Sequence, residues 1–153
     1  MIKITLPFVP CTSVIPIVKF TTVDGKEIYA IVDSGSESTL INKTFKKDFP
    51  GIIQSQKVLG KMTAIGIGGE KEMAVIEAIA QVPAKTDKGE TGTVEITGLV
   101  EDLSTLTAQM KKMHNVEWII SMLIGGDTLS KLTANIEYKK KYLTLYIKKD
   151  TRK

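Results

Sequence analysis

Apolar and polar residues alternate along much of the chain with the two-residue period of β-strands. Six stretches have this character, either as strict alternation or as a continuous apolar run: residues 2–6, 14–20, 28–32, 40–41, 134–138 and 142–147. An Asp-Gly turn at 23–26 connects the second and third stretches, and a lysine turn at 139–141 connects the last two. The pattern predicts a mainly β chain that ends in a hairpin.

A glycine-rich segment lies at the tip of a further predicted hairpin, residues 62–82. Its glycines, Gly66, Gly68 and Gly69, allow a tight turn or the close approach of another backbone. A nucleotide-binding loop is the alternative, but the Lys-Ser ending of a P-loop is missing and a strand-like run follows where a helix is required. We therefore interpret the segment as a hairpin tip, which either covers a ligand or is purely structural. The polar residues 83–93 are predicted to form a loop.

Three segments have helical features. Residues 42–50 fit a short helix closed by a Pro-Gly pair. His114 stands at the end of a second segment and is interpreted as a helix-terminal or surface histidine. Asp127 precedes a short helical pattern and is interpreted as its N-cap rather than as a reactive carboxylate. The second segment is predicted to be an amphipathic helix packed on the core, because apolar residues recur in it at spacings of three and four: Leu99, Leu103, Leu106, Met110 and Met113.

The composition is that of a soluble globular domain. The chain has 153 residues, of which 42% are hydrophobic and 25% are charged, so residues 1–153 are expected to form one domain with a sizeable core. Cys11 is the only cysteine and His114 the only histidine, which excludes an intramolecular disulfide and a conventional structural zinc site; we expect no metal. No apolar run approaches the roughly 20 residues of a membrane-spanning helix. We expect a cytoplasmic protein without a membrane partner.

The net charge of +4 is unevenly distributed. Residues 131–153 contain eight Lys or Arg and two acidic residues, a net charge of +6, which leaves −2 for the first 130 residues. A basic tail of this kind can bind nucleic acid, but no aromatic platform or known nucleic-acid motif accompanies it. We interpret the tail as a solvated edge and do not expect a nucleic-acid partner.

One carboxylate stands between two apolar strands. Residues 28–32 lead into Asp33, and a loop rich in Ser, with Gly35 near its start, continues to Leu40. Gly35 lets the backbone turn tightly, while the hydroxyl groups of the loop supply hydrogen bonds. A solvated turn is the simpler interpretation, because Asp, Ser and Gly are common turn residues. The apolar strands on both sides favour a carboxylate held rigidly at the floor of a cleft.

The order of these features resembles the retropepsin-like aspartic proteases, the retroviral-protease type and its cellular and bacterial relatives. Three segments carry the resemblance: apolar-Asp-Ser-Gly-Ser-x-Ser-Thr at 32–39, the glycine tip at 65–69, and Leu-Ile-Gly-Gly-Asp-x-Leu at 123–129. It implies a mainly β, single-lobe acid-protease-like closed β-barrel with a glycine-tipped flap hairpin and one or two short helices. Relative to compact retroviral enzymes, residues 98–116 form a helical insert.

The resemblance also implies an aspartic endopeptidase that needs no cofactor and acts on a peptide or protein substrate. Asp33 is the expected catalytic residue, and Ser34, Gly35 and Ser36 are expected to support its loop. This chemistry needs two carboxylates and the chain offers one such loop, so the second Asp33 is expected from another copy in a homodimer. Substrate contacts are implied for Glu37, Ile65, Gly66, Ile67, Gly68, Gly69 and Ile124.

Two positions differ from the usual pattern of the family. Asp-Ser-Gly replaces the commoner Asp-Thr-Gly and is a recognised variant. Gly126 stands where retroviral members carry an arginine that pairs with an acidic loop residue, here Glu37. An alternative function is therefore a non-catalytic binding or scaffold domain in which two aspartates never meet. A nucleic-acid-binding barrel that uses the basic tail is a third possibility.

Overall fold

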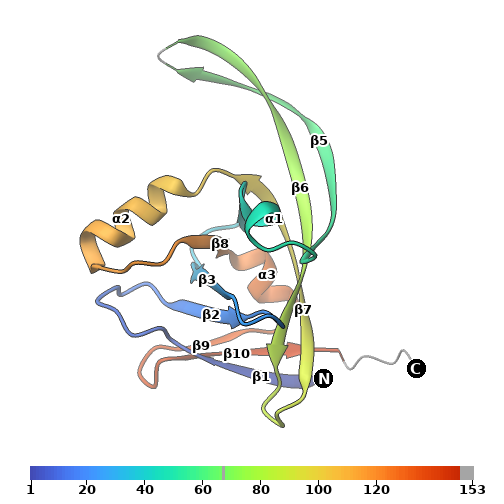
Figure 1. Ribbon diagram of the computed structural model, residues 1–153, viewed down its shortest axis with the longest axis vertical. Coiled ribbons are helices and arrows are strands. Elements are labelled where there is room, and N and C mark those ends of the chain that lie inside the picture. Colours follow the sequence, from blue (N-terminus) through green and yellow to red (C-terminus); the bar gives the residue numbers. More distant parts are fainter. Residues whose placement is uncertain (67, 149–153) are drawn as a thin grey trace.

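The computed structural model describes residues 1–66 and 68–148 and is mainly β (Figure 1). The strands are β1 (Ile2–Pro7), β2 (Ile17–Thr21), β3 (Glu27–Val32), β4 (Leu40–Asn42), β5 (Ile53–Gly66), β6 (Gly69–Lys85), β7 (Thr91–Glu101), β8 (Ile120–Ile124), β9 (Asn135–Glu137) and β10 (Tyr142–Ile147). The helices are α1 (Phe45–Asp48), α2 (Ser104–His114) and α3 (Gly126–Lys131). The described residues thus contain three helices, one in each of the segments with helical features, where the family resemblance implied one or two.

The strands form two separate sheets. The smaller sheet has the order β1-β10-β9, and it includes the predicted terminal hairpin. The larger sheet has the order β2-β3-β8-β4-β7-β6-β5. The predicted closed barrel is not found among the described strands. β1 pairs with β10 alone, and β2 and β5 remain edges of the larger sheet. The sheets are held together by side-chain packing.

Two hydrophobic clusters lie on opposite faces of the larger sheet. The main cluster fills the space between the two sheets and includes Val32 and Ile124 of the larger one and Leu143 of the smaller one, each at most 1% exposed. The second cluster contains Ile31 and Leu123 and is covered by α2. Burying both faces explains why β3 and β8 are continuous apolar runs rather than alternating ones.

Helix α2 is shorter than the predicted helical insert. Leu99 belongs to β7, where it pairs with Leu40 and Glu77, and Met113 is 69% exposed rather than packed on the core. Pairing with strands on both sides keeps β7 extended to Glu101. The helix is fixed to β8 by the Thr107 hydroxyl, which accepts a hydrogen bond from the Ile120 N–H at 3.0 Å. His114 ends the helix, as predicted.

Strands β5 and β6 form the predicted hairpin, which extends as a two-stranded ribbon away from the body (Figure 1). Alternate residues near the base of β6 are buried, but the described side chains of the outer part are exposed on both faces. The large apolar ones among them are at least half exposed: Val58, Leu59, Met62 and Met73. The outer part of the ribbon therefore has no packing partner among the described residues.

The predicted loop at 83–93 is wrong, since β6 continues to Lys85 and β7 begins at Thr91. Pro83 is tolerated because of its position. The Gln81 N–H donates to the Ile52 carbonyl at 2.9 Å, so the nitrogen two residues later points to the same side of β6. The β5–β6 pairing ends at Ile53 and Ala80, so β5 does not extend alongside Pro83. No strand on that side of β6 therefore requires a backbone N–H donor from Pro83.

Candidate active site

Asp33 begins the connection between β3 and β4. Its backbone N–H donates to the Ile124 carbonyl at 2.9 Å, which ties the loop to the end of β8. The Gly35 N–H donates to Asp33 Oδ1 at 3.0 Å, and the Ser36 N–H donates to the Asp33 carbonyl at 3.1 Å. A Cβ atom at position 35 would lie 3.3 Å from Oδ1, so glycine gives this carboxylate room. The turn therefore orients a carboxylate that remains partly exposed.

The register of β3 and β8 shows which apolar residues share a face with Asp33. The two strands run parallel, with Ile31 opposite Leu123 and Val32 opposite Ile124. Side chains along a strand alternate between faces, which places Asp33 on the face of Ile31 and Leu123. Ile124 is instead 1% exposed in the main core. In the single chain Ile124 therefore faces the main core, and Leu123 is the residue of this pair on the Asp33 face.

Gly125 and Gly126 hold the back of the Asp33 loop. The Gly126 N–H donates to the Ser36 carbonyl at 2.6 Å. A Cβ atom at position 125 would lie 2.5 Å from the Ser38 carbonyl oxygen and 2.7 Å from its carbon, a distance that real Cβ atoms do not reach. At position 126 the nearest such distance is 3.4 Å, to the Ser36 carbonyl oxygen. The contact between loop and helix α3 thus requires glycine at 125 far more strictly than at 126.

The hydroxyl group of Thr39 connects the loop, β8 and α3. It donates to Asp127 Oδ1 at 2.6 Å, lies 2.6 Å from the Thr128 hydroxyl and accepts the Gly125 N–H at 3.1 Å. Because its single proton goes to Asp127, the Thr128 hydroxyl acts as donor to it. Thr39 is 1% exposed and Thr128 5% exposed, so the contact between their hydroxyl groups is shielded from water, whereas Asp127 is exposed.

Asp127 is not the N-cap of α3, contrary to the prediction. Gly125 occupies that position, and Asp127 lies in the first turn with its side chain directed to β4. Its carboxylate also accepts the N–H groups of Thr39 at 3.3 Å and of Thr128 at 2.7 Å. Burial acts to raise the pKa of Asp127, but the hydrogen bonds from Thr39 and Thr128 outweigh it and hold the pKa below its ordinary value.

The other predicted site residues make fewer contacts with the rest of the chain. Ser34 and Glu37 are exposed, and Glu37 makes no ion pair among the described residues. The Ser36 hydroxyl donates to the Ser38 carbonyl at 2.9 Å. In the hairpin tip, β5 ends with Ile65 and Gly66, β6 begins at Gly69, and Gly68 lies in the turn between them; Ile67 lies outside the described residues. In Figure 1 the tip lies well clear of the β3–β4 connection.

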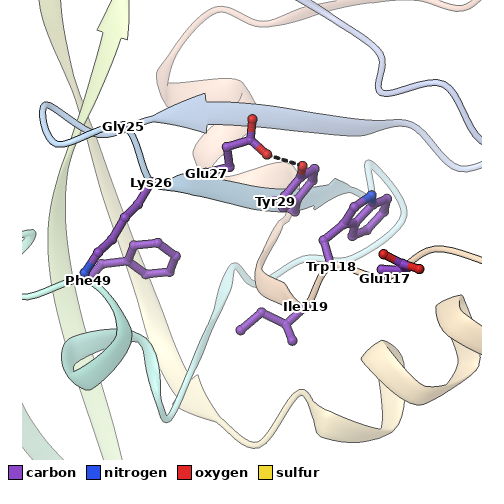
Figure 2. Close-up of a pocket in the computed structure, with 8 residues that line it drawn as sticks. All are labelled: Gly25, Lys26, Glu27, Tyr29, Phe49, Glu117, Trp118 and Ile119. Carbon is purple, nitrogen blue, oxygen red and sulfur yellow. Dashed lines mark hydrogen bonds between the residues drawn. The ribbon is translucent and has the colours of Figure 1, made fainter.

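Two cavities lie near this region, and neither contains Asp33. One, of about 280 Å³, lies behind the loop and is lined in part by Ser38, Thr39 and Asp127. The other, of about 610 Å³, lies between β3, α1 and the segment before β8 (Figure 2). Asp33 is thus not among the residues that line either cavity, and its side chain is partly exposed.

The described part of the chain shows neither a metal-binding cluster nor a membrane-spanning helix. It contains no group of three or more His, Cys, Asp or Glu side chains arranged to hold a metal ion. None of its helices combines the length and the apolar character that crossing a membrane requires.

Comparisons with known proteins give likenesses to solved structures only. No family model and no curated protein matches the chain. A retropepsin-like aspartic protease from Rickettsia conorii is similar at 15% identity over 94% of this chain and 91% of that one, with a TM-score of 0.42. The retroviral protease-like domain of Ddi1 from Leishmania major is similar at 15% identity over 88% and 81%, with a TM-score of 0.40.

A third structure, a protein of unknown function from Legionella pneumophila, is similar at 11% identity over 76% of this chain and 85% of that one, with a TM-score of 0.32. The structural neighbours thus include retropepsin-like proteases at low identity. The function of this chain has to be inferred from its own residues.

Proposed function

We propose that the chain is a retropepsin-like aspartic endopeptidase whose active site is formed by two Asp33 carboxylates, one from each subunit of a homodimer. The observation that carries the proposal is the bracing of the Asp33 loop. Gly35, Ile124 and Gly126 fix it through backbone hydrogen bonds, yet the carboxylate itself stays partly exposed. A surface turn with no role has no need of such bracing.

The second carboxylate has to come from another copy. Asp127 does not supply it, because its oxygens accept hydrogen bonds from Thr39 and Thr128. The sequence contains one Asp-Ser-Gly loop. A two-fold axis beside Asp33 would bring two identical loops face to face, as an isologous interface does.

The mechanism follows from placing two carboxylates side by side. Repulsion between like charges keeps one of them protonated while the other stays ionised, and the pair titrates as a unit. The ionised carboxylate accepts a proton from a water molecule, whose oxygen attacks the peptide carbonyl carbon. The protonated carboxyl donates a hydrogen bond to the carbonyl oxygen, and the leaving nitrogen receives a proton as the C–N bond breaks.

The β5–β6 ribbon is the element of the chain suited to hold the substrate. β5 is an edge of the larger sheet, so its unpaired backbone groups can pair with an extended peptide. Glycines at the tip allow the ribbon to bend over the bound chain. In this proposal Ile65–Gly69 and Glu37 contact the peptide, and Leu123 forms part of the apolar floor next to Asp33.

Replacing Asp33 by asparagine tests the proposal. Asp33→Asn keeps the size of the side chain and an oxygen that can accept the Gly35 N–H, so fold and dimer are expected to persist while cleavage of a peptide library is lost. Asp24→Asn, in the exposed turn before β3, is the matched control and is expected to retain full activity. Full activity of the Asp33 variant, with a normal fold, would overturn the assignment.

The alternative is a non-catalytic binding domain. It is favoured by Gly126, which leaves Glu37 without the arginine of retroviral members. Sedimentation distinguishes the two functions, because a chain that stays monomeric at concentrations where peptides are tested cannot assemble a shared site.

A further inference from the structure

The cavity of about 610 Å³ does not belong to the Asp33 loop and is unused by the proposed mechanism. Its lining comes from the β2–β3 turn, from Tyr29 of β3, from Phe49 after α1 and from residues 117–119 before β8 (Figure 2). Ile119 is 40% exposed, an unusual fraction for a large apolar residue next to a core strand. The surface is therefore apolar in part and open to solvent.

Tyr29 and Trp118 form a rigid aromatic platform in this cavity. Their rings are stacked, with centroids 4.4 Å apart and planes at 4° to each other. The Tyr29 hydroxyl donates to Glu27 Oε2 at 2.5 Å. Burial and this hydrogen bond to Glu27 raise the pKa of Tyr29 to about 12, so the phenol stays protonated and holds its orientation. Stacking and hydrogen bonding together fix the platform before any ligand arrives.

The charged residues that line the cavity have a net negative charge. The lining contains Lys26, Glu27 and Glu117, a net charge of −1. Lys26 Nζ is engaged outside the cavity, since it donates to the Asp48 carbonyl at 3.4 Å and lies 3.9 Å from Asp24 Oδ2. Figure 2 shows Glu27 and Glu117 at opposite ends of the stacked pair.

The two carboxylates differ in whether they are already satisfied. Glu27 accepts the Lys19 ammonium at 3.1 Å and the Tyr29 hydroxyl, so both of its oxygens have a partner. Glu117 is exposed, and within the described residues it makes no ion pair and no side-chain hydrogen bond. Glu117 thus supplies an unpaired negative charge directly beside the indole of Trp118.

We propose that this cavity binds an arginine side chain in an extended, basic segment of a partner protein. The guanidinium group would pair with Glu117 and stack against Trp118, because its planar cation suits both a carboxylate and an aromatic ring. An apolar neighbour of that arginine would contact Ile119 and Phe49. Anionic ligands are disfavoured by the unpaired carboxylate of Glu117, since Glu27 is already paired with Lys19.

The position of the platform suggests what such binding would do. Tyr29 and Ile31 both pack against the second hydrophobic cluster, and Asp33 follows on the same face of β3. A protein held at Tyr29 and Trp118 is therefore held on the Asp33 side of the sheet. If the proposed function holds, the cavity recruits basic protein substrates, but the binding itself does not require Asp33 to be catalytic.

Fluorescence of Trp118, the only tryptophan of the chain, reports binding directly. The full chain with Asp33→Asn, in which cleavage is absent, is titrated with the peptide acetyl-Ala-Leu-Arg-Leu-Ala-amide and with its glutamine counterpart. We expect a saturable emission change with the arginine peptide, weakened by added salt, and none with the glutamine peptide. Equal responses to both peptides, or none to either at millimolar concentration, would overturn the proposal.

Variants at two exposed glutamates separate a specific pair from general attraction. Glu117→Gln is expected to weaken binding of the arginine peptide about tenfold, the effect of losing one charge-assisted hydrogen bond at a partly exposed site. Glu90→Gln, in the turn between β6 and β7, changes the net charge equally and is expected to leave affinity unchanged. Equal weakening by both variants, or none by Glu117→Gln, would contradict a site at Trp118.

Discussion

The Asp33 loop and the β5–β6 ribbon are both connections between strands, but they are stabilised in opposite ways. The loop is fixed at Asp33, Ser36 and Thr39 by hydrogen bonds to Ile124 of β8 and to residues 125–128 at the start of α3. The outer ribbon has its own strand pairing and nothing else, with apolar side chains exposed on both faces. An isolated two-stranded hairpin is only marginally stable in water.

This difference suggests that the Asp33 loop and the β5–β6 ribbon have different roles. A reacting carboxylate gains from being held in one geometry, since misplacement by about 1 Å costs activity steeply. An element that has to let a substrate enter and leave gains from low local stability. Substitutions that disturb the loop should therefore destabilise the whole chain, whereas substitutions in the ribbon should leave stability almost unchanged and affect activity only.

The largest effect is expected from Gly125→Ala. The added methyl group would meet backbone atoms of Ser38, which cannot move without breaking the loop. We expect a loss of about 3 kcal/mol in the free energy of unfolding, the upper end for overpacking, measured by urea denaturation. Gly126→Ala is the matched control and should lose less than about 1 kcal/mol, because its neighbour is 3.4 Å away. Equal effects at both positions would mean that the close approach is relaxed in solution.

Thr39→Val should have the next largest effect. It keeps the shape of the side chain but removes the hydroxyl that serves Asp127, Thr128 and Gly125. Leaving buried polar groups without partners costs on the order of 2 kcal/mol in unfolding free energy. Thr39→Ser retains the hydroxyl and should recover most of the loss. A valine variant as stable as the parent chain would contradict the role given to this network.

Asp127 should make stability depend on pH in the acid range. Its pKa is held below the ordinary value in the folded chain, so its contribution is fully present above the unfolded pKa of about 3.9 and is lost as pH falls through the folded value. Urea denaturation between pH 6 and 2.5 should show a shallower acid decline for Asp127→Asn than for the parent chain. Identical slopes would show that the carboxylate is not stabilised by folding.

The smallest effect on stability is expected in the ribbon. Met73 is 51% exposed, and Met73→Ala should change the unfolding free energy by no more than about 0.5 kcal/mol. Met122 in β8 is fully buried, and Met122→Ala should cost about 3 kcal/mol. A loss of stability in Met73→Ala comparable to that in Met122→Ala would mean that the ribbon is packed against something in solution.

The sequence was most informative where structure is decided locally. The Asp33 turn, the Asp-Gly turn before β3, the long hairpin and the terminal hairpin were predicted because their signals lie within a few residues. The loop predicted at 83–93 was wrong because the tolerance of Pro83 depends on where β5 ends. Leu99 was assigned to a helix because its spacing to Leu103 fits a helical period, while pairing with β4 and β6 keeps it extended.

The long-range part of the candidate site could not be predicted. Thr39 and Asp127 are 88 positions apart, and nothing in either segment indicates that their side chains meet. The choice of Leu123 over Ile124 on the Asp33 face depends on the register between β3 and β8, which no local pattern encodes. Because side chains along a strand alternate between the two faces, the sequence alone does place Ile31 on the same face as Asp33. Ile31 is the residue opposite Leu123.

Mixing the parent chain with its Asp33→Asn variant tests the central claim of a shared site most directly. Equal amounts of the two chains are allowed to exchange subunits, and peptide cleavage is measured at constant total concentration. If each site needs one Asp33 from each subunit, only parent–parent dimers are active, and activity falls to about a quarter of that of the parent chain alone. Activity of about one half would show that each chain works on its own and would contradict the shared site.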